Sequence, residues 1–231
     1  MFPCKLSHAV CAALLVSAAS FASALSLSDL SSKDATSGVK AALEKGADVA
    51  VNKLGVENGF LNNDKVRIGL PASLDKAMPI LRMMGQSKKV DELQTSMNHA
   101  AEAAVAQAKP LLLNAVKSMS VTDAKNILTG GETSVTEFFR QKTATPLSTQ
   151  FLPIVKKITD KNGLSAKYNT LMGKASSSGL VSKDEATVEN YVTQRALDGL
   201  YKIIGEEEKS IRADPGGTGS AILGKVFGAV K

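Results

Sequence analysis

SKDEATVENYVTQRALDGLYKIIGEEEKSIRADP, residues 182–215, is the stretch that decides the fold. Ser182 followed by Glu185 is a capping-box pattern, in which each side chain can bond the backbone N–H of the other residue. Apolar residues then recur every three or four positions, as on one face of a helix: Val188, Tyr191, Val192, Ala196, Leu197, Leu200, Tyr201, Ile203 and Ile204. Asp214, Pro215 and two glycines end the pattern. We therefore predict a helix over residues 183–213 at the centre of the fold.

The rest of the chain repeats this spacing, without a fixed-period repeat. Helices are expected over residues 31–54, 73–84, 88–119, 120–129, 133–142, 145–161, 164–175 and 219–230. We expect Pro79 to kink or reset its helix, Pro110 to kink its helix without ending it, and Thr145-Pro146 to start a new one. Residues 55–71 are the least helical, and residues 66–70 could be extended. The pattern predicts an all-α, single-domain multi-helix bundle with long central helices and little or no β structure.

The first 24 residues have the pattern of a secretory signal peptide. Residues 9–21 are apolar but shorter than the about 20 residues of a membrane-spanning helix. Ala22-Ser23-Ala24 is the small-x-small pattern that signal peptidase cuts. We predict cleavage after Ala24 and a periplasmic protein, with a retained N-terminal anchor as the alternative. Residues 25–214 would form the helical domain.

Residues 215–231 would form a glycine hinge and a C-terminal amphipathic helix. Its apolar side chains follow one another at helical spacing, and two lysines make it slightly basic. We expect this helix to dock on the core, because its polar face is thin. Binding to a membrane surface or a partner is the alternative.

Composition excludes several kinds of chemistry. Cys4 and Cys11 both lie in the predicted signal peptide, so the mature protein would have no disulfide, thiol nucleophile or cysteine metal site. The chain has 28 Lys and Arg against 22 Asp and Glu, a net charge of +6. This mild excess favours weak contact with anionic envelope surfaces. Scattered basic residues and few aromatics argue against nucleic-acid binding. No further apolar run approaches the length of a transmembrane span.

The charged face of the 183–213 helix is the candidate binding site. Its candidate residues are Arg195, Asp198, Glu207, Glu208 and Arg212. Consecutive acids point about 100° apart on a helix, so the three glutamates from Glu206 onward cannot converge on one atom. Pairs four residues apart, such as Glu208 and Arg212, are also the ordinary spacing of structural ion pairs. Both alternatives, a structural face and a binding face, stay open.

Other candidate motifs lack their required context. His99 is the sole histidine of the predicted mature chain, and no nucleophile-elbow pattern accompanies it. The glycine pairs at 130–131 and 216–217 lack the spacing of a phosphate-binding loop. The polar cluster over residues 58–64 lacks the spacing of a calcium loop. We predict no catalytic residue, no metal site and no cofactor.

Seven short stretches together carry a family resemblance. They are residues 68–71 (IGLP), 97–102 (MNHAAE), 108–110 (AKP), 123–128 (DAKNIL), 151–156 (FLPIVK), 191–200 (YVTQRALDGL) and 206–215 (EEEKSIRADP). The chain resembles, over nearly its whole mature length, the exported bacterial family catalogued as domain of unknown function 4197. The resemblance implies a helical protein of the Gram-negative cell envelope, with no assigned activity and no catalytic residue. Gly69 stands where the family often has Pro, and His99 where it often has Arg.

These observations favour binding over catalysis. The first hypothesis is a non-enzymatic interaction module that binds an envelope protein through the charged face. The second is a carrier of a small apolar or lipid ligand between helices, suggested by methionines expected to point inward: Met78, Met84, Met97, Met119 and Met172. The third is an enzyme that uses only carboxylates and lysines. It would need two acids facing one cleft.

Overall fold

The computed structural model describes residues 31–161, 163–177, 182 and 185–229. The predicted signal peptide lies outside the described residues. The helices are α1 (Ser32–Leu54), α2 (Ala72–Lys76), α3 (Met78–Met83), α4 (Ser87–Val105), α5 (Lys109–Lys117), α6 (Val121–Thr129), α7 (Ser134–Thr159), α8 (Gly163–Ser177), α9 (Val188–Ala213) and α10 (Ala221–Gly228). A 3-10 turn, Gly216–Thr218, precedes α10. No described residue lies in a strand, which confirms the all-α prediction.

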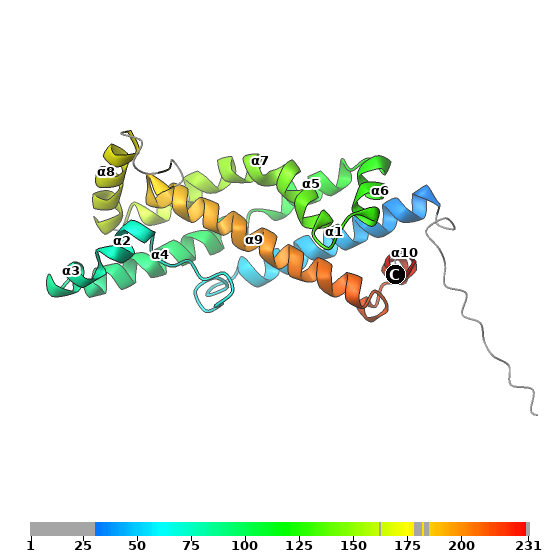
Figure 1. The fold of residues 1–231 in the computed structure, drawn as a ribbon, viewed down its shortest axis with the longest axis horizontal. Coiled ribbons are helices and arrows are strands. Elements are labelled where there is room, and N and C mark those ends of the chain that lie inside the picture. Colours follow the sequence, from blue (N-terminus) through cyan, green and yellow to red (C-terminus); the bar gives the residue numbers. More distant parts are fainter. Residues whose placement is uncertain (1–30, 162, 178–181, 183–184, 230–231) are drawn as a thin grey trace, which may run out of the picture.

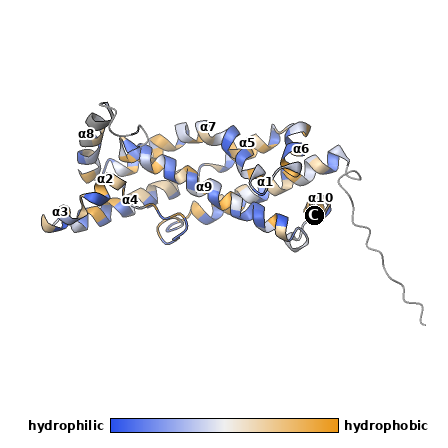
Figure 2. Ribbon diagram, in the orientation of Figure 1, coloured by the Kyte–Doolittle hydropathy of each residue, from blue (hydrophilic) through white to orange (hydrophobic). Residues whose placement is uncertain are grey.

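The bundle is elongated, and α9 is its central helix (Figure 1). α9 packs along α7 and contacts both α1 and α4, which occupy opposite halves of the long axis. α5 and α6 pack between α1 and α7 at one half, while α3 and α8 lie at the far end of the other. Hydrophobic and hydrophilic residues alternate along every long helix (Figure 2). The prediction of a central helix near residues 183–213 is therefore confirmed.

A stripe of alanines lets α4 approach its neighbours closely. Ala100, Ala101 and Ala104 of α4 have no solvent exposure, and α4 packs on both α7 and α9. Small side chains allow helix axes to lie near the short end of the about 8–10 Å range. Large side chains fill the remaining space, with Tyr201 and Phe139 fully buried. The Tyr201 hydroxyl hydrogen-bonds Thr143 Oγ1 at 2.9 Å, so this buried polar group has a partner.

Several helix ends follow their local signals. The Ser31 hydroxyl accepts the backbone N–H of Asp34 at 3.0 Å and caps α1. Ser120 and Asp123 form a reciprocal capping box at the start of α6. The Gly55 N–H donates to Val51 O at 2.7 Å and ends α1. These helix ends are therefore confirmed. Local sequence could predict them because the bonded side-chain and backbone groups lie within four residues of each other.

The prediction of one helix over residues 88–119 is wrong. Pro110 cannot donate a hydrogen bond to Ala106, and its ring would clash with that carbonyl. α4 ends at Val105, and the N–H groups of Gln107 and Ala108 bond three residues back in a tight turn. α5 then begins at Lys109 with Pro110 in its first turn, where no donor is needed. The break redirects the chain so that α5 packs on α1 and α7.

The prediction of a helix start at Thr145-Pro146 is also wrong. α7 runs through both Pro146 and Pro153 without interruption. Phe139 on one side of Pro146 and Leu147 on the other have no solvent exposure, and α4 and α9 pack along this helix. An internal proline costs roughly 3 kcal/mol. Burial of the flanking apolar side chains compensates for that cost.

The predicted capping box at Ser182 does not start the central helix. α9 begins at Val188, and its N-cap is Thr187, whose hydroxyl accepts the Asn190 N–H at 3.1 Å. Asn169 of α8 fixes this end, since its Oδ1 accepts the Val188 N–H at 2.8 Å. A side chain from another helix therefore determines where α9 starts.

Residues 66–70 do not form a strand: the Val66 N–H closes a turn on the Asn63 carbonyl at 3.0 Å, and residues 67–70 have no regular secondary structure and no strand partner among the described residues. The Asn98 side chain of α4 replaces one. Its Oδ1 accepts the Ile68 N–H at 2.8 Å, and its Nδ2 donates to the Ile68 carbonyl at 2.9 Å. Asn98 is fully buried, so this amide satisfies both backbone groups of a segment that no sheet supports.

Pro79 resets the helical segment over residues 72–83 into α2 and α3, as predicted. Met84, predicted to point inward, is 65% exposed, so that prediction is wrong. α3 packs on α2 and α4, and none of its residues is buried. Met97 and Met119 are buried as predicted.

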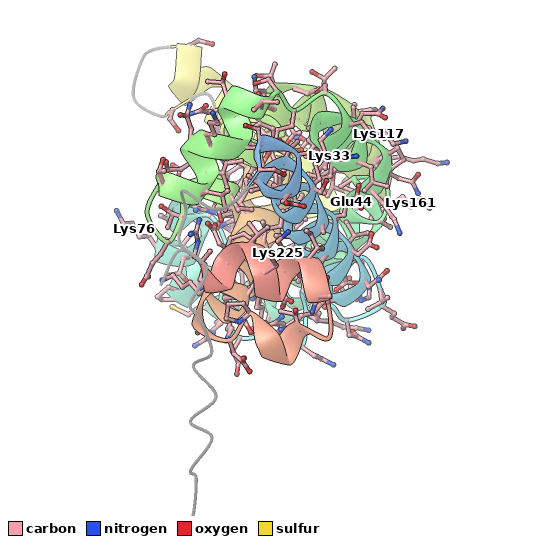
Figure 3. The ribbon with its side chains drawn as sticks, turned by 90° about the vertical axis from the view of Figure 1, so that its right-hand side faces the viewer. Lys33, Glu44, Lys76, Lys117, Lys161 and Lys225 are labelled. Atoms are coloured by element: carbon pink, nitrogen blue, oxygen red, sulfur yellow. The ribbon has the colours of Figure 1, made fainter. Side chains whose placement is uncertain are left out.

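α10 lies beside α1, as the view along the bundle shows (Figure 3). Leu223, Val226 and Phe227 are buried against the core, and Lys225 pairs with Asp34 of α1 at 2.9 Å. Its apolar face is thus covered by the rest of the chain. Among the described helices, none is both long and apolar enough to cross a membrane.

Candidate functional site

The predicted site residues of α9 separate into three positions. Glu208 and Arg212 lie at a buried junction with the turn between α6 and α7. Arg195 and Asp198 line an open pocket farther along α9. Glu207 lies on a third side, with its carboxylate 4.0 Å from Lys45 Nζ of α1. The charged face therefore does not form one site.

The Glu208 carboxylate caps α7 from another helix. It accepts the backbone N–H groups of Val135 at 3.0 Å and Thr136 at 3.1 Å, and the Thr136 hydroxyl at 3.1 Å. The residue before α7, Thr133, makes no side-chain cap hydrogen bond. First-turn N–H groups lack partners within their own helix, and a negative charge there is favourable. Glu208, which is 3% exposed, supplies both the hydrogen-bond acceptor and the negative charge.

Arg212 completes this junction. Its guanidinium donates to Glu208 Oε1 at 3.1 Å, to Ser134 Oγ at 2.7 Å and to the Ile127 carbonyl in the last turn of α6 at 2.9 Å. It also lies over the Phe227 ring, 5.4 Å from the centroid. The pair thereby joins α6, α7, α9 and α10. This geometry favours the structural alternative for Glu208 and Arg212.

The open pocket lies between α9 and residues 65–69 of the loop that precedes α2. Its volume is about 270 Å³. Its lining residues are Lys65, Val66, Arg67, Ile68, Gly69, Tyr191, Arg195, Asp198, Gly199 and Lys202. We call it the basic pocket, because four cationic side chains and a single carboxylate line it.

Hydrogen bonds from two helices hold the loop wall of the basic pocket, residues 65–69. Asn98 of α4 bonds both backbone groups of Ile68. The Tyr191 hydroxyl of α9 lies 3.3 Å from the Gly69 carbonyl, and Lys202 Nζ donates to the Lys65 carbonyl at 2.8 Å. The wall is therefore held at three residues, Lys65, Ile68 and Gly69. The geometry of the pocket depends on these contacts rather than on regular secondary structure.

Gly199 lines the basic pocket, and its lack of a side chain allows the loop that follows α1 to approach α9 closely. A Cβ at this position would lie 2.7 Å from Cε1 of the buried Phe60 ring and 3.4 Å from Cβ of Val66. Glu102 of α4 holds the same loop, because its carboxylate accepts the N–H groups of Asn58, Phe60 and Leu61 at 3.0–3.1 Å. The pocket thus rests on a loop that is anchored on its buried side.

The charges around the basic pocket do not cancel. Asp198 is shared by Arg195 at 3.5 Å and by Arg140 of α7 at 3.6 Å. Arg195 also lies over the Tyr191 ring, 5.2 Å from its centroid. Lys65 pairs with Glu206 at 3.0 Å. No ion pair is described for the exposed Arg67, so the pocket keeps an excess of positive charge.

Such a pocket can bind an anion through its guanidinium and ammonium groups. No serine, cysteine or histidine lines it. His99 lies on α4, with Nε2 4.0 Å from the Glu102 carboxylate, and is no part of the pocket. The described residues contain no group of three or more His, Cys, Asp or Glu that could hold a metal ion.

Sequence reasoning found Arg195 and Asp198 but missed Lys65, Arg67, Tyr191 and Lys202 as pocket residues. Arg195, Asp198 and Lys202 share one face of α9 by their three- and four-residue spacing, so Lys202 could have been added. No sequence signal points to Arg67, because its segment meets α9 only through the tertiary fold.

The basic pocket, its supporting contacts and the junction of Glu208 with Arg212 contain residues from four of the stretches that underlie the family resemblance. These stretches are residues 68–71, 97–102, 191–200 and 206–215. No curated protein and no solved structure matches the chain. The family described as "Protein of unknown function (DUF4197)" matches residues 29–228. The protein belongs to this family, and all described helices lie within the matched residues.

Proposed function

We propose that this protein is a non-enzymatic interaction module of the bacterial cell envelope that binds an acidic segment of a partner protein in the basic pocket. The observation that supports this most directly is the side-chain set that lines the pocket, four cations and Asp198, which stays positive even though Lys65 pairs with Glu206 beside the pocket. Arg67 and Arg195 are exposed and can reach an incoming carboxylate. A planar guanidinium binds a carboxylate through two parallel hydrogen bonds.

The size of the basic pocket supports a small anionic group as its ligand. A volume of about 270 Å³ is below the range of most pockets for whole small molecules, which begins at about 300 Å³. One or two acidic side chains of a larger partner fit such a space. The partner would then make its remaining contacts on the surrounding surface of α9.

The carrier alternative has less support. The pockets of about 210–300 Å³ among the described residues are open, and polar or charged side chains make up most of the lining residues of each. The apolar hollow between Ala42, Gly46 and Ile204 is too narrow for a water molecule. Of the methionines that suggested a carrier, Met84 is exposed, while the buried Met97 lies in α4 and the buried Met119 follows α5.

The envelope location rests on the sequence pattern of residues 1–24. Expression of the full chain in a Gram-negative host tests it. We expect release with the periplasmic fraction and an N-terminus at Leu25 by mass spectrometry. An uncleaved chain in the cytoplasmic fraction would contradict this part of the proposal.

Binding of a labelled hexaglutamate peptide, followed by fluorescence anisotropy at low salt, tests the pocket. We expect Arg67→Ala and Arg195→Ala each to weaken binding roughly tenfold, because a hydrogen bond to a charged group contributes about 1.5–3 kcal/mol. The matched controls are the single variants Lys33→Ala and Lys117→Ala. Each removes one positive charge, as each pocket variant does, from an exposed residue that does not line the pocket and is labelled in Figure 3.

Hexaglutamine should not bind, and added salt should weaken the hexaglutamate complex. Equal loss of affinity in the pocket and control variants would mean that net charge alone attracts the peptide. That result, or the absence of binding, would overturn the pocket assignment. Circular dichroism should show unchanged helicity in every variant.

A further inference from the structure

Three large hydrophobic side chains gather on the surface of α3 and the residue after it. Ile80 is 63% exposed, Met83 89% and Met84 65%. Among the described residues, the other exposed large hydrophobic side chains are Val56, Val121 and Leu152, each isolated. We call Ile80, Met83 and Met84 the α3 patch. Scattered exposed apolar residues are ordinary, whereas a cluster indicates a contact surface.

The α3 patch lies at one extreme end of the elongated bundle (Figure 1). Figure 2 shows hydrophobic residues on α3 at this tip. Leu81 packs against the core from the same helix, so it holds α3 in place. The patch therefore projects from a fixed helix into solvent, away from α10 at the opposite end.

Exposed basic side chains surround the α3 patch. Lys76 precedes α3, Arg82 lies within it, and Lys88 and Lys89 follow in the first turn of α4. Asp75 is the sole acid between residues 75 and 89, and Asp91 and Glu92 follow in α4, where Glu92 lies 4.0 Å from Lys88 Nζ. Lys76, Arg82 and Lys89 still leave an excess of positive charge around the patch. Lys76 extends outward from the body of the bundle in Figure 3.

A second basic surface adjoins the start of α4. The hollow between α4 and α8 has a volume of about 210 Å³ and is lined by Lys89, Lys161 and Lys167 together with Glu92. It brings Lys161, which precedes α8, and Lys167 of α8 to the same end of the molecule as α3. This end thus combines an apolar tip with positive charge from two separate parts of the chain.

We propose that this end of the protein binds the surface of an anionic phospholipid bilayer, with the α3 patch inserted among the headgroups. Apolar side chains bordered by Lys and Arg are the pattern of helices that lie in the membrane interface. Each basic residue near an anionic surface contributes about 1 kcal/mol. A second copy of the chain is a poorer occupant, because its own lysines would face these across the contact.

Vesicle binding tests the proposal on the chain from Leu25, which contains every described residue. The probe is a vesicle of phosphatidylglycerol and phosphatidylcholine in equal parts, compared with phosphatidylcholine alone. We expect co-sedimentation with the anionic vesicles only. Lys76→Gln and Arg82→Gln should each weaken it about fivefold, the equivalent of about 1 kcal/mol. Ile80→Ser with Met83→Gln and Met84→Gln should abolish it.

The matched control replaces the isolated exposed side chains. Val56→Ser with Val121→Thr and Leu152→Gln removes as many large hydrophobic groups from the surface, but away from the α3 patch. This variant should sediment with vesicles as the unchanged chain does. If it loses vesicle binding to the same extent, general surface hydrophobicity explains the binding and the proposal is overturned.

A tryptophan probe locates the contact directly. The chain has no Trp, so Met83→Trp introduces a single indole at the tip. Its emission should shift to the blue on addition of anionic vesicles, because the indole moves into a less polar environment. Val121→Trp should show no shift. A shift at position 121 alone, or none at either, would contradict the proposed orientation.

Two further outcomes would overturn the membrane proposal. One is a chain that does not bind anionic vesicles. The other is a dimer, measured by light scattering, that the α3 substitutions dissociate while vesicle binding persists. The proposal stands apart from the basic pocket: Arg67→Ala should leave vesicle binding unchanged, and the α3 substitutions should leave hexaglutamate binding unchanged. Failure of one proposal is therefore distinguishable from failure of the other.

Discussion

Glu208 of α9 accepts the backbone N–H of Val135 in the first turn of α7 at 3.0 Å, although 73 residues separate the two in sequence. The same carboxylate pairs with Arg212, whose guanidinium reaches the end of α6. One side chain thereby supplies the cap that α7 lacks locally. The position of α7 relative to α9 depends on this contact.

We predict that Glu208→Ala destabilises the protein by about 3–5 kcal/mol, because removing one partner leaves a largely buried charge without compensation. Urea unfolding followed by circular dichroism measures this. Lys209→Ala, one residue away and exposed, should change the free energy of unfolding by less than about 0.5 kcal/mol.

A double-mutant cycle with Arg212→Ala checks that the two side chains act together. The double variant should be less destabilised than the sum of the single variants, since neither charge is then buried alone. Additive effects would show that Glu208 stabilises α7 independently of Arg212.

Glu102→Ala should release the loop that carries the basic pocket. The lost carboxylate accepts three backbone N–H groups of this loop, at Asn58, Phe60 and Leu61. Hydrogen bonds to a charged group contribute about 1.5–3 kcal/mol each, so we expect faster amide hydrogen exchange over residues 58–61. Glu92→Ala, on the exposed surface of the same helix, is the control. Unchanged exchange in the loop would mean that Phe60 packing alone holds it.

Two glycines of α1 should respond in opposite directions to substitution by alanine. A Cβ at Gly38 would lie 2.5–2.9 Å from three atoms of Val226, so Gly38→Ala should displace α10 and cost about 1–3 kcal/mol. A Cβ at Gly46 would meet Ile204 at an ordinary 3.8 Å. Gly46→Ala should stabilise by about 0.5–1 kcal/mol, because alanine is the better helix former.

Thermal unfolding of the two alanine variants measures these effects. Faster proteolysis near residues 214–220 in Gly38→Ala would locate the displacement. If the two variants have equal melting temperatures, close packing of α10 on α1 is not important for stability.

The capping box of α6 predicts a pH dependence. A hydrogen bond from the Ser120 backbone N–H, followed by one from the Ser120 hydroxyl, holds the pKa of Asp123 below its ordinary value of 3.8. A lowered pKa in the folded state means that the stabilisation is present above the unfolded pKa and is lost as the pH falls through the folded pKa. Asp123→Asn should therefore remove part of the stability loss below about pH 4.

NMR titration of the Asp123 carboxyl measures the pKa directly. Ser120→Ala removes the hydroxyl contact and keeps the backbone one, so the pKa should rise but remain below the ordinary value. A pKa in Ser120→Ala equal to that in the unchanged chain would assign the whole effect to the backbone N–H.

Local signals predicted the beginnings and ends of helices where both partners are near in sequence. Ser31 and Ser120 cap as expected because each bonds a backbone N–H three residues later. Pro79 resets its helical segment as predicted, whereas the predictions for Pro110 and Pro146 are wrong. Pro110 ends a helix and Pro146 does not, because only the latter lies in a helix packed along its length by α4 and α9.

The residues of the candidate site also fall into two groups: those that local spacing could place and those that only the tertiary fold brings together. Arg195 and Asp198 could be placed together from their spacing on α9, and they do line one pocket. Arg67 could not be assigned to that pocket, because Asn98 and Tyr191, on two other elements, hold its segment there. The role of Glu208 as a cap of α7 could not be predicted from the sequence either, because the groups that it and Arg212 bond lie in α6 and α7.

Sequence by itself determined the all-α class, the central position of the 183–213 region and the family resemblance. Three- and four-residue periodicity is a local property that a single helix expresses before it packs. Only the tertiary structure decided which carboxylates cap distant helix ends and which cations share a pocket. Glu102 binds a loop 42 residues away, and Glu208 a helix 73 residues away. Such partners are set by the packing of helices, because a buried polar group must find its hydrogen bonds wherever the fold places it.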